Sequence, residues 1–402
     1  MPVRFDRRTF LKFLPATLIS HQGVSVAANI VGRKRARELG IRIGRLQPGK
    51  WNAITDVAGV RVGHSTIIRG SGPLKVGIGP VRTGVTVIWP HEEIFSEYLP
   101  FGFHTQNGNG EMTGLTQSTS LGVIGSPIFL TNTSSVGMVY DAAQSRLPSD
   151  AVPQLVPIVG ETWDAFLNDV EGRHVKAEHV LSAMDQATSG PVQEGCVGGG
   201  TGMICYGFKG GIGTASRHLP EPLQQYTVGV LVQANHGIRE LLRIDGVSVG
   251  EEILDMKPQP DNASFFNSIL IVIATDAPLL DYQLDRIAKR GGMGLAKTGS
   301  ISSNSSGDFI LAFSTANRIK KSDFWHGDSY ELHSIEQFDI QPLFEAASEA
   351  TEEAIINALF MATTMIGRDD HKVYALPIER MLKIMERHRR LFRSEEKKIA
   401  AI

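Results

Sequence analysis

The run ILIVIA, from Ile269 to Ala274, restricts the fold more than any other stretch of this sequence. Its apolar residues never alternate with polar ones, which is the pattern of a strand that is buried on both faces. Polar sequence punctuated by proline, residues 256–262, precedes the run. We therefore expect a wholly buried strand that the chain enters from a loop.

The dipeptide Asn267-Ser268 stands at the entrance to this strand. A serine hydroxyl placed there can attack the carbonyl just before it, so that the peptide bond becomes an ester and hydrolysis leaves Ser268 as a new N-terminus. That residue would carry nucleophile and base together, because an α-amine titrates near roughly 7.7–8.0 and a lysine near roughly 10.4. A serine at a strand entrance is also common without any chemistry, and the local pattern leaves both interpretations open.

Charge and length narrow the classes of function. The 402 residues include 40 basic and 42 acidic side chains, and the net charge of −2 leaves no footprint for nucleic acid or for an anionic surface. The sequence has no run of about 18 apolar residues, so we expect no membrane span. The length suits two ordinary domains or one large layered α/β structure.

We expect no metal and no other cofactor. Cys196 and Cys205 lack the paired spacing of zinc ligands, and a disulfide between them is compatible with the sequence but not implied by it. No His-Glu-x-x-His motif occurs. The glycine-rich segment 106–115, QNGNGEMTGL, lacks the third glycine of a dinucleotide-binding loop, so nucleotide binding has little support.

Residues 1–28 have the features of a targeting signal. Arg7-Arg8-Thr9-Phe10-Leu11-Lys12 has the twin-arginine form, a short apolar region follows, and Val26-Ala27-Ala28 supplies small residues for cleavage. We expect export to the periplasm, because such signals carry folded proteins across a membrane. The alternative is a disordered basic N-terminus, since residues 21–23 interrupt the apolar region.

The rest of the chain alternates between strand and helix patterns. The expected strands are two paired segments over 52–64 and 79–90, then 126–131, 155–159, 226–232 and 309–313, with loops around a short strand over 198–217. The expected helices follow 126–131, span 174–188, run from about residue 280 to a stop at Gly291-Gly292, and span 341–366. Residues 238–267 form the expected exposed linker. This order favours an α/β layered sandwich over a doubly wound sheet.

Several separated motifs together resemble one known family. They are NAITDVAGVRVGH, GPVRTGVTVI, QNGNGEMTG, TNTSSVG, GTGMICYGFKGGIGTASR, ATDAPLL, TGSISSNSSGD and AFSTAN, which span residues 52–317. The chain is similar to the L-aminopeptidase/D-alanine-esterase-amidases and β-peptidyl aminopeptidases, a family that includes nylon-oligomer hydrolases. The resemblance implies a four-layer αββα sandwich of the N-terminal-nucleophile-hydrolase type, shared with ornithine acetyltransferase. It also implies self-cleavage at Asn267-Ser268 into an α chain, residues 29–267, and a β chain, residues 268–402.

The resemblance also implies roles for single residues. It assigns Ser268 as nucleophile, Asn235 as oxyanion donor, Glu161 as the acid that holds the substrate's free amino group, Trp163 as a wall of the pocket beside that group, and Ser306 and Asp308 as the pair near the new amine. Without the resemblance, Asn235 is equally a turn residue and Glu161 an ordinary acid at a strand end. Glu111 competes with Glu161 for the amine-binding role.

The implied function is a self-cleaving aminopeptidase or amidase that releases N-terminal residues, β-amino acids or small L or D residues, from peptides and amides. The implied assembly is a homo-oligomer of αβ heterodimers, with a tetramer expected. Alternatives are a nylon-oligomer-type amide hydrolase, an acyltransferase to an amine acceptor, and a catalytically silent binding protein that kept the fold. The substrate stays open, because an Asn before the scissile bond is found in the nylon-hydrolase branch, whereas many aminopeptidases of the family have Gly there.

Overall fold

The computed structural model describes residues 32–148, 155–223, 225–260, 267–337 and 339–392. Residues 1–28, where we predict the export signal, lie outside this part, as do residues 261–266 just before the expected cleavage point. The elements described below belong to the compact unit Arg33–Ile402.

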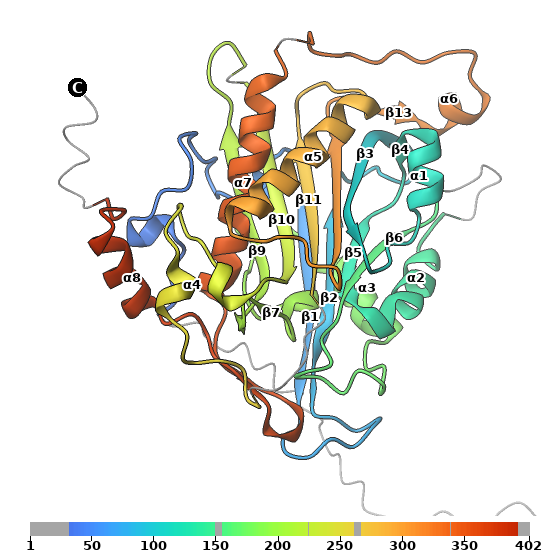
Figure 1. Ribbon diagram of the computed structural model, residues 1–402. Helices are drawn as coiled ribbons and strands as arrows, with labels where there is room; N and C mark the ends of the chain where they lie inside the picture. The colour runs from blue at the N-terminus through green and yellow to red at the C-terminus, as the bar shows by residue number, and fades with distance from the viewer. Residues whose placement is uncertain (1–31, 149–154, 224, 261–266, 338, 393–402) are drawn as a thin grey trace, which may run out of the picture. The chain divides into compact units, whose positions relative to one another are not determined.

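The apolar run forms β11 (Ser268–Thr275), and all eight of its residues are buried, as the sequence predicts. β11 pairs antiparallel with β10 (Thr227–Asn235) and parallel with β12 (Gly307–Ser314), and Figure 1 shows it between these two neighbours. The larger sheet has the order β13-β3-β12-β11-β10-β9, with β4 on β3. Its other strands are β3 (Glu97–Gly108), β4 (Val123–Ile124), β9 (Gly211–His218) and β13 (Ile319–Lys320).

A second, smaller sheet has the order β1-β2-β5-β6. Its strands are β1 (Arg61–Arg69), β2 (Val81–Trp89), β5 (Ile128–Asn132) and β6 (Ile158–Thr162). The expected pairing of 52–64 with 79–90 is confirmed for β1 and β2, although Ile54–Asp56 forms a 3-10 helix. The strand expected over 155–159 is β6, shifted by three residues.

Helices cover the outer face of each sheet, as Figure 1 shows. α5 (Asp281–Lys297) and α7 (Gln341–Met361) pack on the larger sheet, and α2 (Val136–Gln144) and α3 (Ala177–Asp185) pack on the smaller one. Within β11, Ile269 and Ile271 belong to the core under α5 and α7, whereas Leu270 and Val272 belong to the core between the sheets. Both faces of the strand are therefore apolar, and the expected αββα sandwich is confirmed.

Two expected helix ends are wrong. α5 continues through Gly291-Gly292 to Lys297, because these glycines bring the helix close to the sheet. A Cβ on Gly291 would lie 2.8 Å from Cγ2 of Ile310, and one on Gly292 would lie 2.6 Å from Oε1 of Gln106. α7 ends at Met361, and Met365–Ile366 forms β14, which pairs with β15 (Lys372–Val373).

The segment expected as an exposed linker is packed over most of its described length. Residues 238–260 carry a 3-10 helix, Arg239–Leu241, and α4 (Val249–Glu252). Leu242, Ile244 and Ile253 are buried in the core under α5 and α7, and this burial explains why the segment cannot be a free linker. The loops expected over 198–217 contain a full strand, β9, because its small residues lie under α7, where a Cβ on Gly213 would meet the carbonyl oxygen of Ala354 at 2.0 Å.

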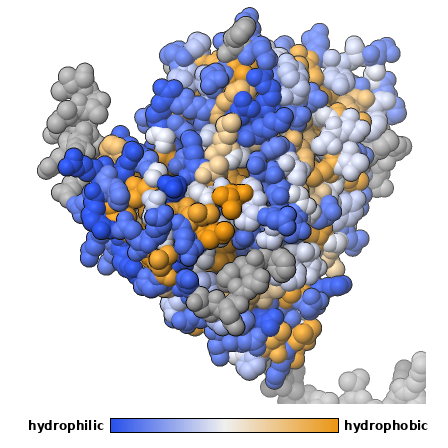
Figure 2. Space-filling view, in the orientation of Figure 1, coloured by the Kyte–Doolittle hydropathy of each residue, from blue (hydrophilic) through white to orange (hydrophobic). Residues whose placement is uncertain are grey.

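The remaining elements are short. They are the 3-10 helices Arg37–Leu39, Thr133–Ser135, Gly198–Gly200 and Arg368–Asp370, the strands β7 (Ile204–Cys205) and β8 (Phe208–Lys209), and the helices α1 (Leu115–Leu121), α6 (Lys321–His326) and α8 (Ile378–Arg387). Among the described residues no helix is long and apolar enough to cross a bilayer. The face shown in Figure 2 is mostly hydrophilic, with apolar residues in smaller patches.

Candidate functional site

Three strand ends meet at the head of β11. Ser268, its first residue, lies opposite Asn235, the last residue of β10, and opposite Gly307, the first residue of β12. Ser268 and Asn235 are each 4% exposed. By alternation with Leu270, the Ser268 side chain is on the face that looks toward the smaller sheet. The structure thus brings two sequence-predicted residues together in a water-poor setting.

The hydroxyl of Ser268 lies against the peptide bond that we expect it to cleave. Its Oγ donates a hydrogen bond to the carbonyl oxygen of Asn267 at 2.5 Å. The backbone N–H of Gly307 lies 3.3 Å from that same carbonyl oxygen and 3.3 Å from the Ser268 Oγ. Gly307 therefore donates to the oxygen on which negative charge would develop during attack.

Sequence reasoning missed Gly307. Its signal is the glycine in the turn SSGD, since a Cβ at this position would lie 2.7 Å from the carbonyl oxygen of Asn109. A side chain there would push away the backbone of Asn109 and Gly110. The close approach of two backbones explains why glycine is needed.

The Asn235 amide is held from both ends. Its Oδ1 accepts a hydrogen bond from the N–H of Ile204 at 2.8 Å, and its Nδ2 donates to the carbonyl oxygen of Trp163 at 3.1 Å. Its amide is thus fixed beside Ser268. The role of Asn235 as an oxyanion donor toward a substrate stays a prediction.

Ser306 and Asp308 flank Gly307 and bond to each other. The Ser306 hydroxyl donates to Oδ1 of Asp308. Burial raises the pKa of Asp308, while hydrogen bonds from Ser306, Ser302 and the Ile269 N–H act in the opposite direction. Asp308 is fully buried, and it lies opposite Ile269 in the β11–β12 ladder, one step from Ser268. The pair therefore lies within one ladder step of Ser268, and its contact with a freed amine stays a prediction.

Glu161 lies at the end of β6, across the sandwich from β11. An added Cβ on the preceding Gly160 would lie 2.9 Å from Cδ1 of Leu270, which places this part of β6 over the head of β11. A Cβ on Gly110 would lie 3.0 Å from Oε1 of Glu161 and 3.3 Å from Cα of Gly307. The carboxylate is therefore on the Gly307 side of Ser268.

The two candidate acids differ in burial. Glu161 is 5% exposed, and its oxygens accept from the N–H of Glu111 at 3.2 Å and from the Thr133 hydroxyl. Burial raises the pKa of Glu161, and the hydrogen bonds from Thr133 and Glu111 oppose that rise. The Glu111 side chain is exposed and accepts from the next backbone N–H. A closed pocket for a cation therefore favours Glu161, and Thr133 is a supporting residue that sequence reasoning did not single out.

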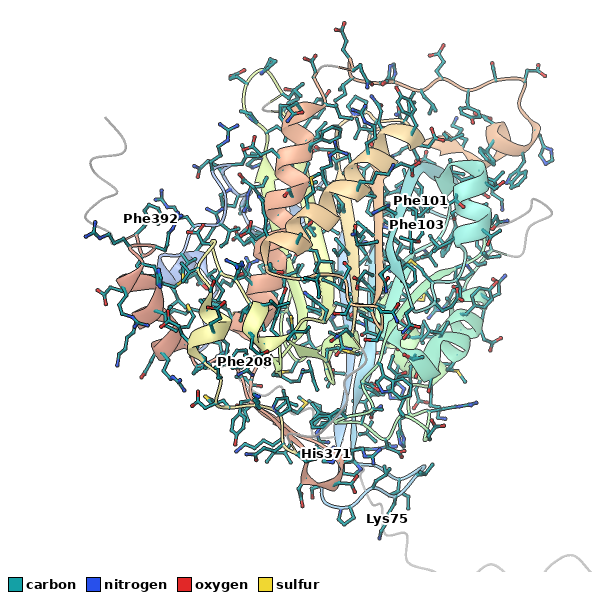
Figure 3. The ribbon with its side chains drawn as sticks, viewed as in Figure 1. Lys75, Phe101, Phe103, Phe208, His371 and Phe392 are labelled. Carbon is teal, nitrogen blue, oxygen red and sulfur yellow. The ribbon has the colours of Figure 1, made fainter. Side chains whose placement is uncertain are left out.

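Trp163 lines a cavity near the end of β10. The cavity has a volume of about 220 Å³ and also borders Asn235 and Asn267. Apolar walls come from Phe166 and Ile204, and the Arg368–His371 turn closes one end. Figure 3 shows His371 at the lower end of the strands. Glu161 is not among the residues that line this cavity, so the expected place of Trp163 beside the amine-binding acid stays a prediction.

The described residues hold no cluster of three or more His, Cys, Asp or Glu side chains that could bind a metal ion. Cys196 and Cys205 are both free thiols. The chemistry that the assembled residues can carry out is nucleophilic: a buried hydroxyl lies beside a carbonyl whose oxygen accepts a backbone N–H, and two buried carboxylates, Asp308 and Glu161, lie nearby.

Comparisons with known proteins agree with this geometry. Residues 52–373 match the model of peptidase family S58. The chain is 44% identical to the β-peptidyl aminopeptidase BapA of Sphingosinicella microcystinivorans over 95% of this chain and 98% of that protein. A solved β-aminopeptidase from Burkholderia sp. superposes with a TM-score of 0.81 at 44% identity, covering 88% of this chain and 99% of that one.

A third similar protein has a solved structure whose fold has been named. The L-aminopeptidase D-Ala-esterase/amidase of Ochrobactrum anthropi, described as a variant of the Ntn hydrolase fold, has a TM-score of 0.83 at 40% identity and covers 89% of this chain and 99% of its own. The sandwich, the serine at the strand end and the family match therefore indicate the same class of enzyme. The chain belongs to peptidase family S58 and is a hydrolase of the N-terminal-nucleophile fold class.

Proposed function

We propose that this chain is a self-cleaving aminopeptidase that releases the N-terminal residue of peptides and amides through an acyl-enzyme on Ser268. One observation carries the proposal. The Ser268 Oγ lies 2.5 Å from the Asn267 carbonyl oxygen, which in turn accepts the N–H of Gly307. A nucleophile, a carbonyl and an oxyanion donor are therefore assembled before any cleavage has occurred.

Self-cleavage begins when the Ser268 Oγ attacks the carbonyl carbon of Asn267. The C–O bond forms, the Asn267–Ser268 C–N bond breaks, and the hydroxyl proton moves to the departing nitrogen. Water then hydrolyses the ester, which leaves a carboxylate on Asn267 and a free α-amine on Ser268. The N–H of Gly307 stabilises the oxyanion in this step.

In turnover, the Ser268 hydroxyl attacks the carbonyl carbon of a substrate. The α-amine takes the proton of the Ser268 hydroxyl as the oxygen attacks, and the protonated amine returns it to the leaving nitrogen. Ser306 and Asp308 orient the amine, Asn235 stabilises the oxyanion, and Glu161 holds the substrate's own amino group. The relatives' names point to β-residues or small L and D residues as the class released.

The test is intact mass with N-terminal sequencing of the purified chain. We expect two polypeptides, the smaller one beginning at Ser268 and ending at Ile402. Ser268→Ala should stay uncut and inactive, whereas Ser305→Ala, a matched change in the nearby turn, should cut normally. A single uncut chain with full aminopeptidase activity would refute the mechanism.

Location and assembly form a separate part of the proposal. Arg7-Arg8 supports export through a twin-arginine signal to the periplasm, and the family resemblance supports a homo-oligomer of processed heterodimers. Replacing both arginines by lysine should leave the protein in the cytoplasm and still cut, since folding precedes export. Light scattering of the purified enzyme measures the number of heterodimers, and a single heterodimer would refute the assembly.

A further inference from the structure

The cavity beside Asn235 is lined by apolar and neutral polar residues and by one formally charged residue, Arg368. At about 220 Å³ the cavity is smaller than the roughly 300–1,000 Å³ of pockets that take drug-sized ligands. It is therefore of a size for one side chain. The Arg368 side chain is 28% exposed and already forms an ion pair with Asp369.

The turn that carries Arg368 is held rigidly against the cavity wall. The N–H of Arg368 donates to the carbonyl oxygen of Leu167 at 3.0 Å. Nδ1 of His371 bonds to the carbonyl oxygen of Phe166 at 2.8 Å, and the His371 ring stacks on that of Phe166 with 4.6 Å between centroids. Two independent contacts thus fix both ends of the turn.

Within this turn the guanidinium is only partly engaged by its neighbour. Nε of Arg368 donates to Oδ2 of Asp369 at 2.8 Å, and Oδ1 of Asp369 accepts from the N–H of Leu74 at 2.8 Å. The contact with Asp369 uses one of the five N–H bonds of the guanidinium and fixes its plane. The edge formed by the two terminal nitrogens is the one that binds carboxylates in a bidentate manner.

Asn267 shows which part of a substrate would reach this cavity. In the uncleaved chain Asn267 is the residue whose carbonyl Ser268 attacks, so it occupies the position of an acyl group. It also lines the cavity. A substrate attacked by the same hydroxyl places its own amino-terminal residue there, with its amino group toward Glu161 on the Gly307 side.

We propose that this cavity receives the side chain of the substrate's amino-terminal residue and that Arg368 binds a carboxylate on it. The inference rests on the proposed function and specifies its substrate class: amides and peptides whose first residue carries an acidic side chain. The geometry suits such a substrate at both ends, because its ammonium faces Glu161 and its carboxylate faces Arg368. Both partners are held by other bonds, so little ordering is needed on binding.

The experiment compares p-nitroanilides of aspartate and asparagine, which have the same shape and differ by one negative charge. We expect the wild type to show a kcat/KM at least about tenfold higher for aspartate, as one charged hydrogen-bonded contact can supply. Arg368→Gln should lower the aspartate-to-asparagine ratio by about tenfold or more. Arg318→Gln removes a half-exposed arginine paired with Glu97 and should leave the ratio unchanged.

A second pair of substrates locates the carboxylate. Asparaginyl-alanine and its C-terminal amide differ only in a carboxylate on the leaving residue. A wild-type preference for the free acid of this pair, lost in Arg368→Gln, would overturn the assignment to the amino-terminal residue. Equal rates on the two anilides, or a ratio that survives Arg368→Gln, would overturn carboxylate binding altogether.

Failure of the inference is distinguishable from failure of the proposed function. If the chain cuts at Ser268 and hydrolyses the asparagine anilide without any charge preference, only the role of Arg368 is wrong. If the chain stays uncut and hydrolyses none of these substrates, the proposed function fails and the inference falls with it.

Discussion

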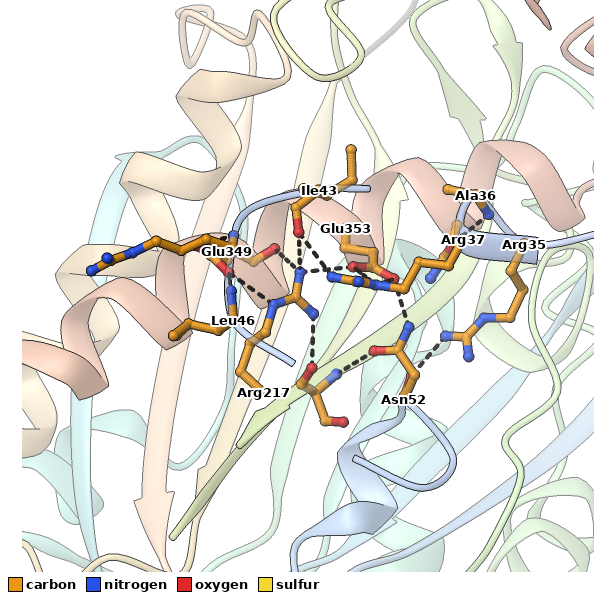
Figure 4. Close-up of polar contacts among 12 residues, drawn as sticks. Arg35, Ala36, Arg37, Ile43, Leu46, Asn52, Arg217, Glu349 and Glu353 are labelled. Atoms are coloured by element: carbon orange, nitrogen blue, oxygen red, sulfur yellow. Dashed lines mark hydrogen bonds and ion pairs between the residues drawn. The ribbon is translucent and has the colours of Figure 1, made fainter. Parts of the chain in front are cut away.

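Removing the charge of Arg217 should destabilise the protein more than any surface ion pair would. Figure 4 shows the network that surrounds this arginine. Its Nε lies 3.0 Å from Oε2 of Glu349 and its Nη2 lies 2.7 Å from Oε2 of Glu353, both on α7. Nη1 donates to the carbonyl oxygen of Ser216 at 2.7 Å, and Nη2 donates to that of Ile43 at 2.8 Å. The side chains of Arg217 and Glu353 are 0% exposed.

The size of the expected loss in folding stability follows from the burial of this ion pair. Removing one partner of a buried ion pair leaves an uncompensated charge and costs on the order of 3–5 kcal/mol. Arg217→Met keeps most of the volume and removes the charge, so we expect a loss in this range at pH 7. Arg37, whose Nε lies 2.8 Å from Glu353, limits the loss, because it keeps one cation beside that carboxylate.

The pH dependence gives a sharper test than the loss itself. Burial raises the pKa of Glu353, but Arg217 and Arg37 outweigh it and hold that pKa below its ordinary value. In the wild type this carboxylate therefore contributes stability above its unfolded pKa and loses it as the pH falls through the lower folded pKa. Without Arg217, burial becomes the dominant influence and favours the protonated form. The deficit of the variant should therefore shrink between pH 7 and pH 5.

The assay is urea unfolding at both pH values in a Ser268→Ala background, so that a single uncut chain unfolds. Arg45→Met is the matched control. Arg45 is exposed and pairs with Glu345, which lies on α7 as Glu349 and Glu353 do. The free energy of unfolding of the control should be close to that of its parent at both pH values. An Arg217→Met deficit below about 1 kcal/mol, or one that grows on acidification, would refute the reasoning.

Three further predictions concern the site and the sandwich. Glu161→Gln should still self-cleave but lose on the order of 2–5 kcal/mol of transition-state binding in kcat/KM on free-amine substrates; equal wild-type turnover of N-acetylated substrates would contradict the role. Asp308→Asn should slow self-cleavage and turnover and move the rising limb of the pH–rate profile to lower pH, because a stabiliser of the ammonium is gone; an upward shift, or none, would leave Asp308 a structural residue. Gly213→Ala should lower the melting temperature, because the new Cβ would lie 2.0 Å from the Ala354 carbonyl oxygen and force β9 away from α7. Such overpacking costs roughly 1–3 kcal/mol. An unchanged melting temperature would show that the helix can shift freely.

The periodicity of the sequence by itself determined the central strand and favoured a layered α/β sandwich, whereas the αββα order of the layers was implied by the family resemblance. The run from Ile269 to Ala274 had to be buried on both sides, because neighbouring residues point to opposite faces and all are apolar. In the structure Ile269 meets the helices and Leu270 meets the second sheet. Strand signals on each side of helical ones were enough to favour a layered sandwich. Each of these inferences depends on side-chain periodicity, which is a local property.

The candidate residues were also named from the sequence, through motifs that resemble a family. What the motifs could not supply was the reason these residues work as a set. Ser268, Asn235 and Gly307 are far apart along the chain and become neighbours only through the β10–β11 and β11–β12 registers. Gly307 was missed because its contribution is a backbone N–H, and a backbone donor leaves little trace in residue types.

Only the tertiary structure decided the points that depend on contacts between distant segments. Gly291-Gly292 has the local pattern of a helix stop, yet the helix continues because the sheet needs its close approach. Glu161 and Glu111 are equivalent as sequence letters, and burial at the end of β6 separates them. The cavity at Arg368 likewise forms where a turn after α7 packs on the segment after β6. In each case the deciding energy is that of packing or desolvation, which local periodicity does not encode.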